Sequence, residues 1–203
     1  MNVYLITYPD EVPDESLIIN RLFEAGLETL HVRKPGYSIS ETATLLKSID
    51  QKYHSRISLH QHHELSRDFQ ISRFHFSEEK RKLLQTSELP TNEKIKKIYS
   101  TSIHKITDYK TLPASFDYCF FGPVFNSISK QNYPSAIPVD FRINENPKTK
   151  IIAIGGIDEN NIEEVKKMGF SGAALLGAIW LSKDPIEKFK NIQHLCQQNQ
   201  FVY

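Results

Sequence analysis

The chain has 203 residues, with 25 lysines and arginines against 24 aspartates and glutamates, so its formal charge at pH 7 is +1. This balance, without a basic stripe that carries aromatic side chains, argues against nucleic acid as a partner. No apolar run reaches the length of a membrane span and the amino terminus lacks a signal-peptide pattern, so we expect a cytoplasmic protein that does not bind membranes. The length predicts a single domain over residues 1–203.

Short apolar segments with strand character recur along the whole chain. In chain order they are Val3–Thr7, Thr29–Arg33, Ile57–His60, Arg73–Ser77, Ile98–His104, Tyr118–Phe125, Lys150–Ile157 and Gly172–Gly177. The seventh is a fully apolar, β-branched run that stops on two glycines. Such a run is typical of a parallel strand that is covered on both faces.

Segments with helical spacing lie between these strands. They are Leu17–Ala25, Ser40–Tyr53, Asn160–Gly169 and Asp184–Cys196. The segment Lys80–Lys97 is dominated by polar residues and keeps no apolar period, so it predicts a shortened or missing helix.

About eight strands that alternate with helices predict an α/β fold, a single small TIM (β/α)8 barrel. A doubly wound open sheet is the main competing architecture. Cys119 falls in a predicted core strand and Cys196 in the last helix, so both are expected to be buried, unpaired thiols.

In a TIM barrel the chemistry lies where the strands end and the following loops begin. The residues expected there are mostly cationic and polar, with few acids. They are His31, Arg33, His60, His75, Ser102, His104, Ser127, Ser129, Lys130, Gly155, Gly156, Leu176 and Gly177. Cationic side chains, hydroxyls and glycine amides together favour an anionic ligand, most simply one or more phosphates.

The glycines after the last two strands are the strongest phosphate signal. Gly155 and Gly156 alone fit a tight strand-to-helix turn as well as a phosphate loop. Because the loops after strands seven and eight commonly form the phosphate site of a TIM barrel, Leu176 and Gly177 in the next loop favour phosphate binding.

Two further signals have a structural alternative. Arg33 and His31 are two residues apart on one strand, so both are expected to face the barrel mouth, although Arg33 beside Lys34 also fits a solvated strand end. His31, His60, His75 and His104 suggest zinc, but they form no recognisable ligand motif, and we expect core or pocket histidines and no metal ligand set.

The order of several motifs resembles the thiamine phosphate synthase family, which includes the thiazole tautomerases. The motifs are His31-Val32-Arg33, Ser102-Ile103-His104, Gly122-Pro123-Val124-Phe125 with Ser127-Ile128-Ser129-Lys130, Ala153-Ile154-Gly155-Gly156-Ile157 and Leu176-Gly177-Ala178-Ile179. The most specific is the Gly-Pro-Val-Phe loop ending in Ser-x-Ser-Lys. The resemblance covers nearly the whole chain and implies a small TIM barrel.

The family joins a pyrimidine methyl diphosphate to thiazole phosphate with release of diphosphate. The resemblance implies that Arg33, Ser102 and Lys130 bind the diphosphate. It implies that Gly155 and Gly156, with the backbone of Leu176 and Gly177, hold the thiazole phosphate, and that Ser127 and Ser129 line the thiazole side. It also implies small phosphorylated substrates and a homodimer.

The chain departs from the family pattern at three places. The family's pyrimidine-binding Gln is His31, and its second Lys on that strand is Pro35. The Asn-Asp pair after strand three is His60-Gln61, and the acid after strand four falls at Lys80, with Glu78 and Glu79 close by. Magnesium is expected from the family, yet its usual ligands are replaced. A synthase with this sequence either binds magnesium through Glu78 or Glu79, or stabilises the diphosphate with Arg and Lys side chains and no cofactor.

Two other interpretations stay open. The tautomerase branch shares the loss of the strand-three Asp and the His in place of Gln, but it has a proton-transferring His where this chain has Pro123. His31, His60 or His104 is then the candidate proton carrier, since imidazole titrates near neutral pH. The third interpretation is a non-catalytic barrel that binds thiazole phosphate or thiamine phosphate.

Overall fold

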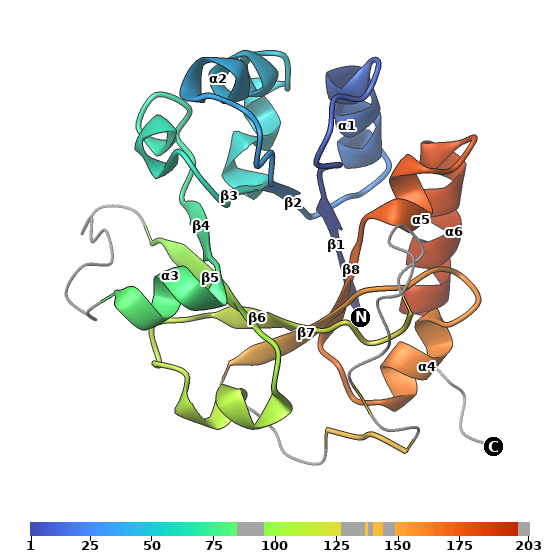
Figure 1. The fold of residues 1–203 in the computed structure, drawn as a ribbon. Helices are drawn as coiled ribbons and strands as arrows, with labels where there is room; N and C mark the ends of the chain where they lie inside the picture. The colour runs from blue at the N-terminus through green and yellow to red at the C-terminus, as the bar shows by residue number, and fades with distance from the viewer. Residues whose placement is uncertain (85–95, 127–136, 138–139, 144–148, 199–203) are drawn as a thin grey trace.

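The computed structural model describes residues 1–84, 96–126, 137, 140–143 and 149–198. Eight parallel strands form a closed barrel in the order β1 to β8, and the helices lie outside it (Figure 1). The strands are β1 (Asn2–Ile6), β2 (Thr29–Val32), β3 (Ile57–Leu59), β4 (Arg73–Phe76), β5 (Ile98–Ile103), β6 (Tyr118–Phe121), β7 (Lys150–Ile154) and β8 (Gly172–Leu175). The predicted TIM barrel is confirmed, and the open sheet is excluded because β1 pairs with β8.

The helices follow the predicted pattern with shifted ends. They are α1 (Glu15–Glu24), α2 (Ile39–Lys47), α3 (Glu78–Leu83), α4 (Ile162–Lys167), α5 (Gly177–Trp180) and α6 (Pro185–Gln197), with 3-10 turns η1 (Gln51–Arg56), η2 (His63–Ser66) and η4 (Ile106–Thr111). The helix predicted over Ser40–Tyr53 is wrong as one element, because it is divided into α2 and η1. A capping box between Ser38 and Glu41 fixes the start of α2.

The polar segment after β4 contains a short helix, α3, as the weak pattern predicted. Its N-terminus is capped by the Ser77 side chain, which accepts a hydrogen bond from the Lys80 amide at 3.2 Å. The rest of that segment, residues 85–95, lies outside the described residues.

Strand alternation divides the core into two layers. Outward side chains such as Leu5, Leu30 and Ile151 pack under the helices. Inward side chains such as Ile6, Phe120 and Ile152 fill the barrel. Within the described residues, every helix is too short or too polar to span a lipid bilayer.

Both cysteines behave as predicted. Cys119 and Cys196 are buried and unpaired, and burial raises the pKa of their thiols to about 12 and about 11. Both are therefore protonated and unreactive at neutral pH.

Candidate active site

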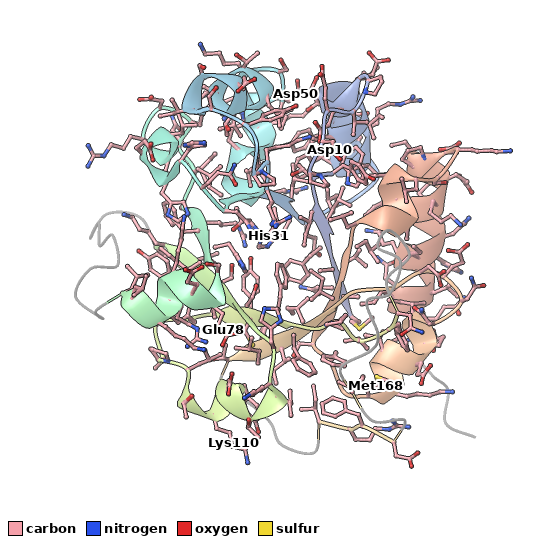
Figure 2. All side chains as sticks on the ribbon, viewed as in Figure 1. Asp10, His31, Asp50, Glu78, Lys110 and Met168 are labelled. Carbon is pink, nitrogen blue, oxygen red and sulfur yellow. The ribbon has the colours of Figure 1, made fainter. Side chains whose placement is uncertain are left out.

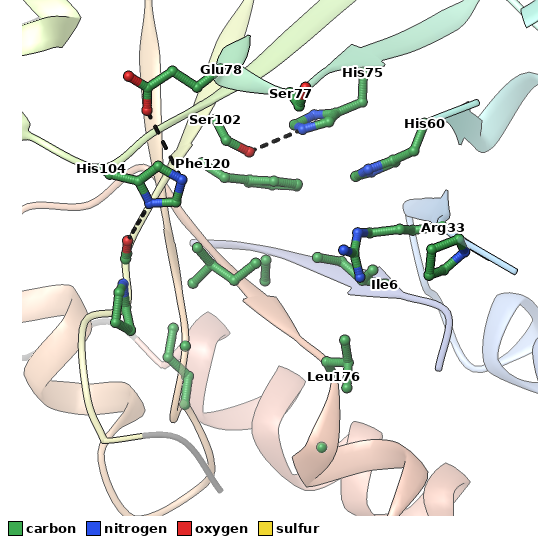
Figure 3. Close-up of a pocket in the computed structure, with 18 of the residues that line it drawn as sticks. Ile6, Arg33, His60, His75, Ser77, Glu78, Ser102, His104, Phe120 and Leu176 are labelled. Carbon is green, nitrogen blue, oxygen red and sulfur yellow. Dashed lines mark hydrogen bonds and ion pairs between the residues drawn. The ribbon is translucent and has the colours of Figure 1, made fainter. Parts of the chain in front are cut away.

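A cavity of about 610 Å³ opens at the carboxyl ends of the strands (Figure 3). Nine of the residues expected at the mouth line it, namely Arg33, His60, His75, Ser102, His104, Gly155, Gly156, Leu176 and Gly177. Ser127, Ser129 and Lys130 lie outside the described residues. Strand register alone thus brings most of the predicted mouth together from β2, β3, β4, β5, β7 and β8.

His31 does not line the cavity and lies one layer below it, near the middle of the barrel (Figure 2). Its expected position at the mouth was therefore wrong, because β2 continues past it and only Arg33 reaches the opening. The ring is fully buried but well connected. Its Nδ1 lies 2.9 Å from Nε2 of His60, and its Nε2 lies 2.8 Å from the Tyr118 hydroxyl.

His75 completes a cluster of imidazoles in the barrel floor. Its ring stacks on that of His60 at a centroid distance of 4.0 Å. Its Nδ1 lies 2.9 Å from the Ser100 hydroxyl, and its Nε2 lies 3.1 Å from the Ser102 hydroxyl. Two ladders of polar contacts therefore run from the barrel interior to the cavity, through His31 to His60 and through His75 to Ser102.

Burial holds the imidazoles of this cluster neutral. Desolvation, with smaller contributions from neighbouring cationic groups, lowers the pKa of His75 to about 3. The pKa values of His31 and His60 are also well below the ordinary value, mainly through desolvation and then through His75. Neutral imidazoles both donate and accept protons or hydrogen bonds, so the floor can hold a polar ligand or relay a proton.

The cationic side chains of the opening differ in exposure. Arg33 and Lys80 are exposed and line the cavity. Lys34, the neighbour of Arg33, is completely buried and pairs with Glu15 of α1 at 2.6 Å, and its ammonium also donates to the Asp10 carbonyl at 2.7 Å. The idea of a solvated strand end is therefore wrong for Lys34, whose charge is part of the core.

The two glycines after β7 adopt positive φ angles, 99° at Gly155 and 67° at Gly156. A Cβ atom at Gly156 would lie 2.3 Å from the Asn126 carbonyl oxygen, because the loops after β6 and β7 touch there. The interpretation of these glycines as a tight strand-to-helix turn is therefore confirmed on steric grounds. The turn exposes backbone rather than side chain to the cavity.

The loop after β8 leads directly into the four-residue helix α5, which starts at Gly177. Leu176, Gly177 and Ala178 line the cavity beside the β7 glycines. Backbone N–H groups in the first turn of a helix have no partner within the helix. This arrangement after strands seven and eight is the usual phosphate site of TIM barrels.

His104 directly follows β5 and lies across the opening from Leu176 (Figure 3). Its Nδ1 lies 3.2 Å from the carbonyl oxygen of Gly122, and its Nε2 lies 4.0 Å from the Glu78 carboxylate. Lys82 pairs with Glu78 and holds the pKa of that carboxyl below its usual range. At 4.0 Å the imidazole and the carboxylate are beyond hydrogen-bond distance, so they interact through electrostatics across the opening.

The sequence did not predict the roles of three residues in or near the site. Tyr118 was expected to be part of an apolar strand, Lys80 was considered only as a replaced metal ligand, and Lys34 as a surface cation. Tyr118 and Phe120 are two residues apart on β6, so both side chains point to the same face of the strand, and the phenol lies inside the barrel. That alternation is the signal that identifies Tyr118, whereas nothing local to Lys34 reveals its partner on α1.

The magnesium that the resemblance implies does not fit the donors present. Mg²⁺ prefers oxygen ligands in octahedral geometry. Among the described residues that line the cavity, Glu78 alone supplies a carboxylate, and it already pairs with Lys82. The position expected to supply an acid after β3 carries His60 and Gln61, and Glu79 does not line the cavity.

Comparison with known proteins agrees with this geometry. Residues 3–179 match the family model described as thiamine monophosphate synthase. The chain is 26% identical over 181 residues to a thiamine-phosphate synthase from Dictyoglomus thermophilum, covering 86% of this chain and 80% of that one. It is 25% identical over 186 residues to the enzyme of the same name from Dictyoglomus turgidum, covering 89% and 82%.

Solved structures give the same result. A thiamine phosphate pyrophosphorylase from Bacteroides thetaiotaomicron superposes with a TM-score of 0.72 at 27% identity, covering 98% of this chain and 100% of the other. One from Pyrococcus furiosus, at 16% identity and a TM-score of 0.71 over 96% and 94%, supports the fold. Because the family model spans most of the barrel, the chain belongs to the thiamine monophosphate synthase family and is a transferase of thiamine biosynthesis.

Proposed function

We propose that this enzyme joins a pyrimidine methyl diphosphate to a thiazole phosphate, and that its cationic side chains do the work usually given to magnesium. The observation that carries the proposal is the composition of the opening. Arg33 and Lys80 line one side of the cavity, and the glycine loops after β7 and β8 line the other. One anion can bind at each side.

The chemistry follows from this division. As the bond from the pyrimidine methylene to the diphosphate breaks, negative charge grows on the leaving oxygens and positive charge on the methylene carbon. Arg33, Lys80 and, by resemblance, Lys130 stabilise the diphosphate through charge-assisted hydrogen bonds, which strengthen as the charge develops. The thiazole nitrogen then attacks the carbon, so the product keeps the thiazole phosphate.

The other contacts position the partners. Backbone at Gly155, Gly156, Leu176 and Gly177 holds the thiazole phosphate, which fixes the distance between nitrogen and carbon. By resemblance, Ser127 and Ser129 line the thiazole and Ser102 assists the diphosphate. A cytoplasmic homodimer is part of the same proposal and rests on the family.

The test is thiamine phosphate formation by the purified enzyme from the two substrates, first with magnesium and then with excess chelator. We expect product in both conditions, and a loss of product in Lys80→Ala and Lys130→Ala. Lys167→Ala removes an exposed lysine of α4, far from the cavity, and should keep full turnover. Activity that disappears with chelator would contradict the role given to the cations.

A second function, thiazole tautomerase, is favoured by one observation. The imidazole of His104 contacts the carbonyl of Gly122, the residue that directly precedes the position at which the tautomerase branch has its catalytic His. His104 thus supplies an imidazole at the same place from a different strand. His31 and His60, linked by their hydrogen bond, are the other candidate proton carriers.

Solvent-deuterium exchange into the thiazole phosphate measures this activity separately from the synthase assay. His104→Ala should abolish exchange while binding of thiazole phosphate persists. If His31→Ala, His60→Ala and His104→Ala all exchange at the wild-type rate, the tautomerase assignment is wrong.

A further inference from the structure

The three imidazoles in the barrel floor come from three neighbouring strands. His31 is on β2, His60 directly follows β3 and His75 is on β4. One ring nitrogen from each lies within 4.8 Å of the others. His60 and His75 also line the cavity, so this cluster is accessible from the opening (Figure 3).

The hydroxyls of Ser100 and Ser102 set the hydrogen-bonding options of His75. The Ser100 hydroxyl lies 2.9 Å from Nδ1 of His75 and 3.4 Å from the Phe74 carbonyl oxygen. In the tautomer with the proton on Nδ1, that nitrogen donates to Ser100 and Ser100 donates to the Phe74 carbonyl. Nε2 of His75 then has the lone pair and lies on the side of Ser102, which lines the cavity.

The hydrogen bond between His31 and His60 limits their tautomers in the same way. A single proton fits in the 2.9 Å contact between Nδ1 of His31 and Nε2 of His60, so one of the two nitrogens contributes a lone pair. If the proton of His31 lies on Nε2, the Tyr118 oxygen, 2.8 Å away, accepts it, and Nδ1 of His31 has the lone pair. The proton in the contact then lies on Nε2 of His60 and has to move to Nδ1 of that ring before Nε2 can bind an ion.

We propose that His31 Nδ1, His60 Nε2 and His75 Nε2 form a binding site for one borderline transition-metal ion of the Zn²⁺ class, with its fourth position open to the cavity. This inference goes beyond the synthase reaction and does not depend on it. It also departs from the sequence-based expectation that these histidines are not metal ligands, because that expectation considered spacing along the chain and not the approach of β2, β3 and β4.

The distances suit such an ion after small ring rotations. Zn–N bonds of roughly 2.0–2.1 Å in a tetrahedron separate the ligand nitrogens by about 3.4 Å. The observed range, from 2.9 Å for one pair to an upper limit of 4.8 Å, includes that value. The His60 and His75 rings are stacked at 20°, so their lone pairs must turn toward each other when the ion enters.

The surroundings match those of metal-binding histidines. Such a ligand usually donates its second N–H to a carbonyl, carboxylate or hydroxyl, which fixes the ring and its tautomer. The Tyr118 hydroxyl is placed to do this for His31, and the Ser100 hydroxyl for His75. Three neutral nitrogen donors without a carboxylate favour Zn²⁺, Co²⁺ or Ni²⁺ over Mg²⁺ or Ca²⁺.

The experiment uses the full chain without a histidine tag, treated with chelator and then dialysed. Zn²⁺ is titrated in competition with a chromogenic chelator, and Co²⁺ is titrated with detection of its visible absorption bands. We expect one ion per chain and a Co²⁺ spectrum with the strong absorption of tetrahedral coordination. His60→Ala and His75→Ala should each weaken Zn²⁺ binding at least about 100-fold, since the loss of a ligand exceeds the 10–100-fold effect of losing an outer partner.

Two controls remove histidines outside the cluster. His104 lines the same cavity and His194 is exposed on α6, so His104→Ala and His194→Ala should change Zn²⁺ affinity less than about threefold. His60→Gln, at the half-exposed edge of the cluster, replaces His60→Ala if circular dichroism shows that the latter is unfolded. Absence of stoichiometric binding by the folded wild type, or unchanged affinity in both cluster variants, would overturn the proposal whatever the synthase assay shows.

Discussion

The two halves of the barrel interior have opposite chemistry. The half formed by β2 to β5 points polar side chains inward, with His31, His75 and Ser100 fully buried. The half formed by β6, β7, β8 and β1 points mostly apolar side chains inward, among them Phe120 and Ile152. Tyr118 lies at the boundary between the two halves. Its ring packs against the apolar half, and its hydroxyl forms a hydrogen bond with Nε2 of His31.

This difference shows that one closed sheet can hold a network of buried polar side chains in one half and a packed apolar core in the other. Buried polar groups cost free energy unless each finds a partner, and His31, His60, His75, Ser100 and Ser102 satisfy one another, whereas the buried Ser58 hydroxyl has no hydrogen-bond partner among the described residues. The apolar half needs no such network and supplies well-packed volume. Its chemistry comes from the backbone of the glycine loops above it rather than from side chains.

The largest effect is expected at Lys34, a buried charge that follows β2 on the side of the polar half and pairs with α1 outside the barrel interior. Lys34→Met leaves Glu15 buried without its counter-charge, so the free energy of unfolding should fall by about 3–5 kcal/mol. Urea denaturation measures it, and Lys47→Met at the exposed end of α2 is the control. The double variant Glu15→Leu with Lys34→Met should recover most of the loss. Wild-type stability of Lys34→Met would mean that the pair is not formed in solution.

Next in size is the cationic rim of the polar half. Arg33→Ala should lower synthase turnover by about 10²–10³-fold, equivalent to about 2.7–4 kcal/mol, because a donor to the leaving diphosphate is lost. Steady-state kinetics measure this, with Arg67→Ala, exposed near η2, as the matched control. Full activity of Arg33→Ala would restore the interpretation of Arg33 as a solvated strand end.

The polar half should also make stability depend on pH. The pKa of His75 is about 3 in the folded protein against an ordinary value of 6.5, so below about pH 6.5 the unfolded chain binds a proton that the folded one refuses. Stability therefore falls as the pH drops from 6.5 toward 3, by about 1.4 kcal/mol per pH unit for each such histidine. Urea denaturation with chelator at pH 7, 6 and 5 measures the slope, which should be on average about 1 kcal/mol per unit shallower in His75→Gln, because an unfolded histidine is only partly protonated between pH 7 and 6. An unchanged slope would show that His75 is not held neutral.

The smallest effect is expected in the apolar half. Ile152→Val removes one buried methylene from the barrel interior and should cost about 0.5–1.5 kcal/mol. The cost should be the same at pH 7 and pH 5, since no titrating group is touched. A cost that grows with acidity would show that the two halves are coupled and would weaken the comparison.

Much of the fold followed from local pattern. The apolar run that ends in Gly155 and Gly156, and the alternation of strands and helices, predicted the barrel and the side of it on which the cavity opens. Helix ends were less accurate because they depend on caps such as Ser38, which stop or start a helix independently of its apolar period.

For the site, too, some features followed from residue pattern and others depended on tertiary contacts. Residue pattern alone predicted that Arg33, His60, Ser102, His104 and the glycines of the last two loops reach one opening, since the carboxyl ends of parallel strands must meet at one rim. The packing of the folded barrel was needed to show that His31 is buried against Tyr118, that Lys34 pairs with Glu15 and that three imidazoles converge. These contacts join residues that are distant in the chain, and their geometry depends on barrel closure and strand stagger, which leave no local trace in the sequence.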